Sequence, residues 1–200
     1  MPELDFWYEF ASTYSYLAAM RAEALAGEAG VRLRWRPFLL GPIFFAQGWK
    51  TSPFNLYPAK GRNMWRDMER QCAIRGLPLR QPDPFPQNTL VAARLALALP
   101  DESRADFSRA VFHAEFGEGR DISGEQVLRD LLGALDLPAE PVFARAKSDD
   151  VKARLRDNTE DAQRAGVFGA PSFVAADGEL FWGDDRFEQA LDWARGKGTS

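Results

Sequence analysis

Apolar and polar residues alternate with the period of a β-strand near both ends of the chain. Residues 4–10 are rich in aromatic side chains and residues 31–38 alternate with period two, so both segments predict strands. Between them, residues 16–29 are rich in Ala and Leu and stop at Gly30, which predicts a helix. A strand, a helix and a strand this close together predict a βαβ unit with a parallel strand pair.

The middle of the chain has the apolar spacing of helices. Residues 43–56 are expected to form a loop because Gly, Pro and Asn interrupt them. Helical spacing then predicts a block of helices over residues 57–76, 89–99, 102–116, 124–135 and 139–164. Ser123 and Gln126 have the spacing of a capping box at the start of one of these helices.

Strand alternation returns near the C-terminus. Residues 172–176 predict a short strand, Asp177-Gly178 a two-residue hairpin turn, and residues 179–182 the returning strand. A last helix is predicted over residues 186–195. The order of elements predicts an α/β protein with a thioredoxin fold and an all-helical insertion between the second and third strands.

This order also predicts two domains. The thioredoxin-like domain would be discontinuous and consist of residues 1–41 and 147–200. The inserted helical domain would cover residues 42–146.

Composition restricts the partners and the compartment. The 200 residues carry a net charge of −4 and no Lys/Arg-rich stripe, so nucleic acid is not an expected partner. No secretory signal and no apolar run of about 20 residues is visible, so we expect a cytoplasmic protein without a membrane partner.

The chain contains a single cysteine, Cys72, and a single histidine, His113. An intrachain disulfide and a CxxC redox motif are therefore excluded, and no metal site is predicted. Both residues are expected to contribute to helix packing.

Residues 12–15, Ser-Thr-Tyr-Ser, lie where the first strand is expected to turn into the first helix. A thioredoxin-type protein places its CxxC motif there, because a helix N-terminus stabilises a thiolate. The hydroxyl of Ser12 could instead donate a hydrogen bond to a thiolate that belongs to a ligand. The alternative is that Ser12 or Ser15 only caps the helix.

Pro171 precedes the third predicted strand, where thioredoxin folds carry a cis-proline that faces the helix N-terminus. The backbone of Ala170 could then pair with an extended peptide.

Three segments, residues 10–18, 166–173 and 181–186, resemble those of 2-hydroxychromene-2-carboxylate isomerases. These are bacterial relatives of the kappa-class glutathione transferases in the DsbA-like superfamily. The resemblance covers nearly the whole chain and includes residues 51–55 and 58–62. It implies that glutathione is the cofactor and that the fold is of the DsbA and kappa-class type.

The resemblance also implies roles for individual residues. Ser12 is the catalytic residue that holds the glutathione sulfur, and Ala170, beside Pro171, pairs with the glutathione cysteine. The remaining contacts go to the two ends of the tripeptide. Trp182, Gly183, Asp184 and Asp185 receive the γ-glutamyl end, Lys60 pairs with the glycyl carboxylate, and Asn55 lies in a segment that contacts glutathione or substrate.

Simpler roles stay open for some of these residues. Asp184 and Asp185 could only cap a helix, and Lys60 could be a solvated surface lysine. Thr13 stands where the family usually has proline, and Thr51 falls near a position where kappa-class relatives use asparagine.

Three functions follow as hypotheses. The first is a glutathione-dependent cis-trans isomerase whose thiolate adds reversibly to an aromatic conjugated keto acid. The second is a kappa-class-like glutathione transferase or peroxidase, which consumes glutathione. The third is a non-catalytic thioredoxin-fold module that binds peptides or proteins. The resemblance also implies a homodimer as a possible assembly.

Overall fold

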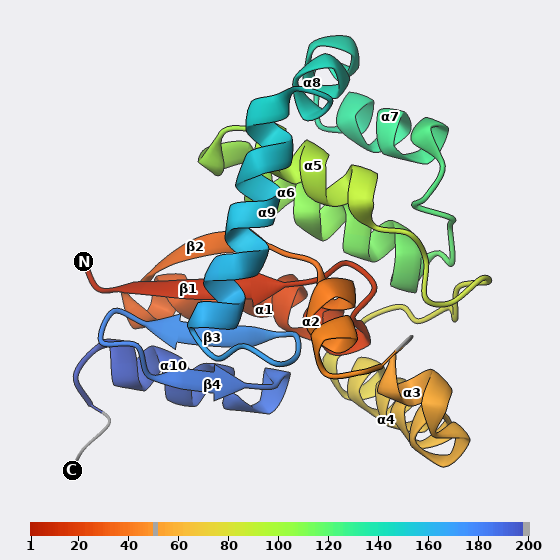
Figure 1. Ribbon diagram of the computed structural model, residues 1–200. Helices are drawn as coiled ribbons and strands as arrows, with labels where there is room; N and C mark the ends of the chain where they lie inside the picture. The colour runs from red at the N-terminus through yellow and green to blue at the C-terminus, as the bar shows by residue number, and fades with distance from the viewer. Residues whose placement is uncertain (50–51, 198–200) are drawn as a thin grey trace.

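A four-stranded mixed sheet forms the centre of the computed structural model, which describes residues 1–49 and 52–197 (Figure 1). Its strands are β1 (Glu3–Tyr8), β2 (Arg32–Pro37), β3 (Ser172–Ala175) and β4 (Leu180–Trp182), in the spatial order β2-β1-β3-β4. Strands β1 and β2 are parallel, whereas β3 is antiparallel to both β1 and β4. The predicted βαβ unit and the predicted hairpin are therefore confirmed.

Helices account for most of the remaining chain. They are α1 (Thr13–Ala29), α2 (Leu40–Ala46), α3 (Pro53–Leu56), α4 (Pro58–Arg75), α5 (Leu90–Ala98), α6 (Asp101–Phe112), α7 (Glu125–Ala134), α8 (Ala139–Ala146), α9 (Asp149–Arg164) and α10 (Phe187–Ala194). A π-helical turn, η1 (His113–Gly117), continues α6, and a 3-10 turn, η2 (Asp184–Arg186), leads into α10. Within the described ranges, no helix is both long and apolar enough to cross a membrane.

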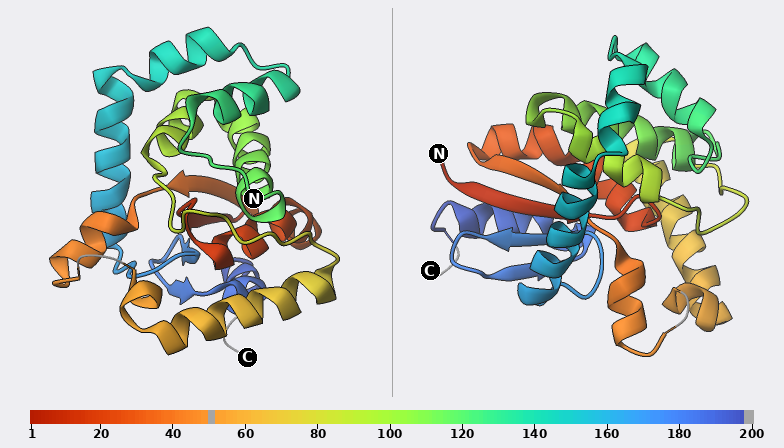
Figure 2. Two further views of the ribbon diagram at one scale, coloured as in Figure 1. Left: turned by 90° about the vertical axis from the view of Figure 1, so that its right-hand side faces the viewer. Right: turned by 45° about the horizontal axis from the view of Figure 1, so that its top comes forward.

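Helices cover both faces of the sheet. α1 and α10 lie on one face and α9 crosses the other, while α5 to α8 form a separate layer beyond β2 (Figures 1 and 2). α4 runs along the opposite end of the molecule, with the C-terminal ends of β1 and β2 between it and the α5–α8 layer (Figure 2). This arrangement confirms the predicted thioredoxin fold with helices inserted between the second and third strands.

The alternation in β1 sends its side chains to two different cores. Phe6 and Tyr8 belong to the main core under α1 and α10, and Trp7 packs with a smaller cluster under α9. In the main core the Phe6 and Phe173 rings lie 5.2 Å apart, and the Phe173 and Phe187 rings lie 4.3 Å apart. These stacked rings attach α10 to the sheet.

The sheet and the inserted helices share one core. The buried cluster that contains Phe6 also contains Phe112 of α6 and Leu132 of α7. A buried hydrogen bond of 2.7 Å joins Tyr8 in β1 to Ser108 in α6. The predicted domain boundaries at 41/42 and 146/147 stay a prediction.

The structure differs most from the sequence-based prediction over residues 43–56, which were predicted to form a loop. The end of α2 and all of α3 lie there. α2 forms because Pro42 occupies its first turn, where a missing N–H costs nothing, and because Ile43 is buried against the small cluster.

Two predicted helix boundaries are also wrong. The stretch predicted over residues 139–164 is two helices, since Ser148 caps α9 by accepting a hydrogen bond of 3.3 Å from the Val151 N–H. The capping box does not form. Gly124 occupies the cap position of α7, and the Ser123 hydroxyl bonds instead to Asp121 at 2.6 Å.

Candidate functional site

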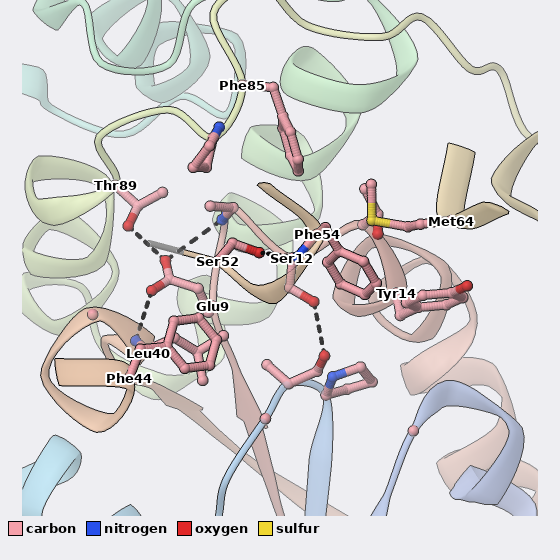
Figure 3. A pocket seen from close by; sticks show the side chains of 18 of the residues that line it. Glu9, Ser12, Tyr14, Leu40, Phe44, Ser52, Phe54, Met64, Phe85 and Thr89 are labelled. Carbon is pink, nitrogen blue, oxygen red and sulfur yellow. Dashed lines mark hydrogen bonds between the residues drawn. The ribbon is translucent and has the colours of Figure 1, made fainter. Parts of the chain in front are cut away.

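Ser12 lies at the N-terminal end of α1 and faces the segment before β3. Its Oγ accepts a hydrogen bond of 3.2 Å from the Ser15 N–H and therefore caps the helix. The same hydroxyl donates a hydrogen bond of 2.8 Å to the Ala170 carbonyl (Figure 3). The Ala170-Pro171 peptide bond is cis. The predictions that Ser12 faces this peptide and that its bond is cis are confirmed, although the two segments are 158 residues apart in the sequence.

A cleft of about 1510 Å³ opens in front of Ser12. Its walls come from the ends of β1 and β3, the start of α1, and helices α2, α3 and α4. Aromatic side chains supply much of this wall, namely Tyr14, Phe44, Phe45, Trp49, Phe54, Phe85, Phe168 and Trp182. A planar, mostly apolar ligand would therefore fit beside the Ser12 hydroxyl.

The structure brings most of the predicted site residues to this one cleft. Those that line it are Ser12, Lys60, Ala170, Pro171, Trp182, Gly183, Asp184 and Asp185. Asn55 belongs to α3, but its side chain lies outside the described residues, as does Thr51.

Asp184 is buried and already paired with two arginines. Its carboxylate accepts from the Arg21 Nε at 3.1 Å and from the Arg75 Nη2 at 2.6 Å, and only 5% of its side chain is exposed. Asp185 is three-quarters exposed and therefore presents the more accessible carboxylate to a ligand. The Arg21–Asp184–Arg75 network joins α1, η2 and α4 across the floor of the cleft.

Two glycines allow the backbone to pack closely around the Trp182 side chain. The Trp182 indole packs against Phe168 at 5.0 Å and lies so near Gly169 that an added Cβ there would be 2.5 Å from Nε1. Gly183 has a φ of +108°, which favours glycine, and it turns the chain from β4 toward Asp185.

Lys60 lies in the first turn of α4 and is exposed. Its Nζ sits 4.8 Å from the centre of the Tyr57 ring, a cation–π contact that leaves its ammonium donors free to reach a carboxylate.

Two buried carboxyl groups, one of them in the cleft wall, were not found from the sequence. Glu9, directly after β1, is 6% exposed and lines the cleft, where it contacts Thr89 and Leu40 (Figure 3). Glu115, in η1, is fully buried, and no hydrogen-bond partner for it lies among the described residues. Burial raises the pKa of both groups above the ordinary value of 4.5. The one sequence signal is a charged residue, Glu9, within an aromatic run.

Cys72 and His113 differ in their environment. Cys72 is buried on α4, and burial raises the pKa of its thiol, so the packing prediction is confirmed for this residue. His113 is partly exposed, and its Nε2 lies 3.5 Å from a Glu118 carboxylate oxygen. It therefore contributes less to the helix core than predicted.

The fold and the site together define a thioredoxin-type protein in which a serine replaces the usual reactive thiol. The chain belongs to the DSBA-like thioredoxin domain family, whose model matches residues 3–193.

Among individual relatives, the chain is 30% identical to 2-hydroxychromene-2-carboxylate isomerase of Sphingobium xenophagum over 186 residues, covering 92% of this chain and 94% of that protein. It is 26% identical to glutathione S-transferase kappa 1 of Caenorhabditis elegans, with 96% and 90% covered. The solved structure of a 2-hydroxychromene-2-carboxylate isomerase superposes with a TM-score of 0.85 at 26% identity, with 98% and 95% covered. The family resemblance and the DsbA-like fold predicted from the sequence are therefore confirmed.

Proposed function

We propose that this protein binds glutathione in the cleft and uses its thiolate as a borrowed nucleophile to isomerise an aromatic conjugated keto acid. The observation that carries the proposal is the position of the Ser12 hydroxyl, at the start of α1 and 2.8 Å from the Ala170 carbonyl. The isomerase relatives and the kappa-class relatives support the same ligand class.

Binding of glutathione would replace the hydrogen bond between Ser12 and Ala170 by two hydrogen bonds to the ligand. The Ser12 hydroxyl would turn from the Ala170 carbonyl to the ligand sulfur, and the freed carbonyl would accept the N–H of the glutathione cysteine. The hydroxyl and the positive end of the α1 dipole both favour the ionised thiol, so its pKa falls on binding. Serine itself needs no deprotonation in this scheme.

The two ends of the tripeptide carry charges that match the cleft walls. The Asp185 carboxylate would pair with the α-ammonium group of the γ-glutamyl end, and the Lys60 ammonium with the glycyl carboxylate. Asp184 would not contact the ligand directly. Its ion pairs with Arg21 and Arg75 would hold η2 in position next to the ligand.

Isomerisation by this route consumes nothing. The thiolate adds to a carbon that is conjugated to a carbonyl group, and the π electrons of the double bond move to the carbonyl oxygen. The new single bond rotates, the electrons return, and the carbon–sulfur bond breaks to release glutathione. The aromatic wall of the cleft would hold the ring of the substrate during this sequence.

The test uses 2-hydroxychromene-2-carboxylate, the compound in the names of the isomerase relatives, with less than one equivalent of glutathione per substrate. We expect many turnovers per glutathione and a constant concentration of free thiol. Consumption of one thiol per turnover would instead support the transferase activity named in the kappa-class relatives. Absence of glutathione binding by calorimetric titration would leave a non-catalytic module and refute the proposal.

A further inference from the structure

The Glu9 carboxyl group faces the cleft, and the proposed function gives it no role. It lies three residues before Ser12, and its backbone carbonyl accepts the Ser12 N–H at 3.0 Å. The backbone that positions the serine therefore also positions the carboxyl group, and both side chains line the same cavity.

Three elements fix the direction of this side chain. The Glu9 Oε1 accepts the Thr89 hydroxyl at 2.5 Å, just before α5, and Oε2 accepts the Leu40 N–H at 3.0 Å, at the start of α2. The Ala11 N–H adds a longer contact of 3.5 Å to Oε1 (Figure 3). Oε1 thus accepts two hydrogen bonds and Oε2 only one, which leaves one position on Oε2 for a further hydrogen bond.

Within the part of the chain that the structure describes, no Arg or Lys forms an ion pair with the Glu9 carboxyl group. Thr89 and Leu40 bring no charge from the segment before α5 or from α2. The titratable group that faces it from η1 is Glu115, and Asp121 lies beyond. Burial without a counter-ion raises the pKa of Glu9 and shifts the group toward its neutral form, by more than the hydrogen bonds from Thr89 and Leu40 lower it.

The addition step needs a donor where negative charge develops. When a thiolate adds to a conjugated ketone, that charge gathers on the carbonyl oxygen, and a preorganised donor there lowers the barrier. The Ser12 hydroxyl is committed to sulfur and the Thr89 hydroxyl to Glu9, and the Phe44 and Phe85 side chains in the same cleft wall have no donors. A carboxyl group that is buried among apolar side chains and kept neutral can act as such a donor.

We propose that the Glu9 carboxyl group is a catalytic hydrogen-bond donor that stabilises the enolate oxygen of the substrate while sulfur is bound to carbon. This inference rests on the proposed function. The O–H group of Glu9 donates to the oxygen as the carbon–sulfur bond forms, and it keeps or recovers its proton as that bond breaks. No proton, electron or co-reactant is consumed.

The main test is Glu9→Gln, assayed with 2-hydroxychromene-2-carboxylate and glutathione across a range of pH. Wild-type activity should fall at high pH as Glu9 ionises. In Glu9→Gln the amide keeps a donor but cannot ionise, so the variant should lose this basic limb, and its kcat should fall by about tenfold because an amide N–H is a weaker donor than a carboxyl O–H. Glutathione should bind the variant as tightly as it binds the wild type, because Glu9 is not part of the sulfur site.

The matched control is Glu115→Gln, which makes the same change at a buried carboxyl group that does not line the cleft. It should keep the kcat of the wild type and should still show a basic limb, because Glu9 remains able to ionise. Equal losses in both variants would indicate a general effect on packing and would overturn the assignment.

A second variant, Thr89→Val, decides the question if Glu9→Gln does not fold. It removes the hydrogen bond that lowers the pKa of Glu9, so the basic limb should move to higher pH. A basic limb that does not move in Thr89→Val, or one that survives in Glu9→Gln, would overturn the inference. Either result would leave the proposed function intact as long as wild-type protein turns over substrate without consuming glutathione.

Discussion

Replacement of Ser12 by alanine tests how the site would activate sulfur. A hydrogen bond to a charged group is worth about 1.5–3 kcal/mol, and one pKa unit corresponds to about 1.4 kcal/mol. Ser12→Ala should therefore raise the pKa of bound glutathione by about 1–2 units, which the ultraviolet absorbance of the thiolate measures during a pH titration. The loss of the helix cap should also lower the free energy of unfolding by about 1 kcal/mol.

Ser15 offers a matched control one turn further along α1. Its hydroxyl is fully buried, and no hydrogen-bond partner for it lies in the described ranges of the chain. Ser15→Ala should leave the thiol pKa unchanged and cost little or no stability. The reasoning would be refuted if Ser12→Ala left the thiol pKa of bound glutathione at the wild-type value, or if both variants raised it equally.

Three other substitutions test separate parts of the structure. Gly169→Ala should displace the Trp182 indole and weaken glutathione binding in a calorimetric titration. Gly27→Ala is the control, because nothing lies within 4 Å of its added Cβ, and it should stabilise α1 by about 0.5–1 kcal/mol in urea unfolding. Equal glutathione binding by the two variants would contradict the role given to Gly169. Wild-type stability should fall as the pH rises above 4.5, because the unfolded chain loses the Glu115 proton before the folded chain does. Glu115→Gln should therefore melt higher than wild type at pH 8, with the difference shrinking toward pH 5, and an unchanged difference would argue against a buried neutral acid. Phe187→Ala should lower the free energy of unfolding by about 3–5 kcal/mol, and a loss below 1 kcal/mol would mean that α10 is not fixed by the stacked rings.

The sequence contains strong local signals for the parts of the fold that could be predicted. Aromatic content and alternation located the first two strands, and the Asp177-Gly178 turn located the hairpin of the last two. The Ser12 and Pro171 motifs were expected to meet because each has a fixed place in a thioredoxin fold, and they do.

The remaining features depend on partners that are distant in the sequence. Asp184 is paired with Arg21 and Arg75, which are 163 and 109 residues away, and no local pattern shows such a pairing. Glu9 likewise depends on Thr89, 80 residues away, for its direction. The short helix α2 was missed because its glycine and proline are typical of loops, and burial of Ile43 outweighs that tendency.

The hydrogen bond from Ser12 to Ala170 has a consequence for the synthesis of this protein. One half of the sulfur site leaves the ribosome 158 residues before the other half. A nascent chain that ends before Ala170 would therefore lack half of the proposed glutathione pocket. Cellular glutathione would stabilise only the finished molecule, by an amount that grows with the logarithm of its concentration.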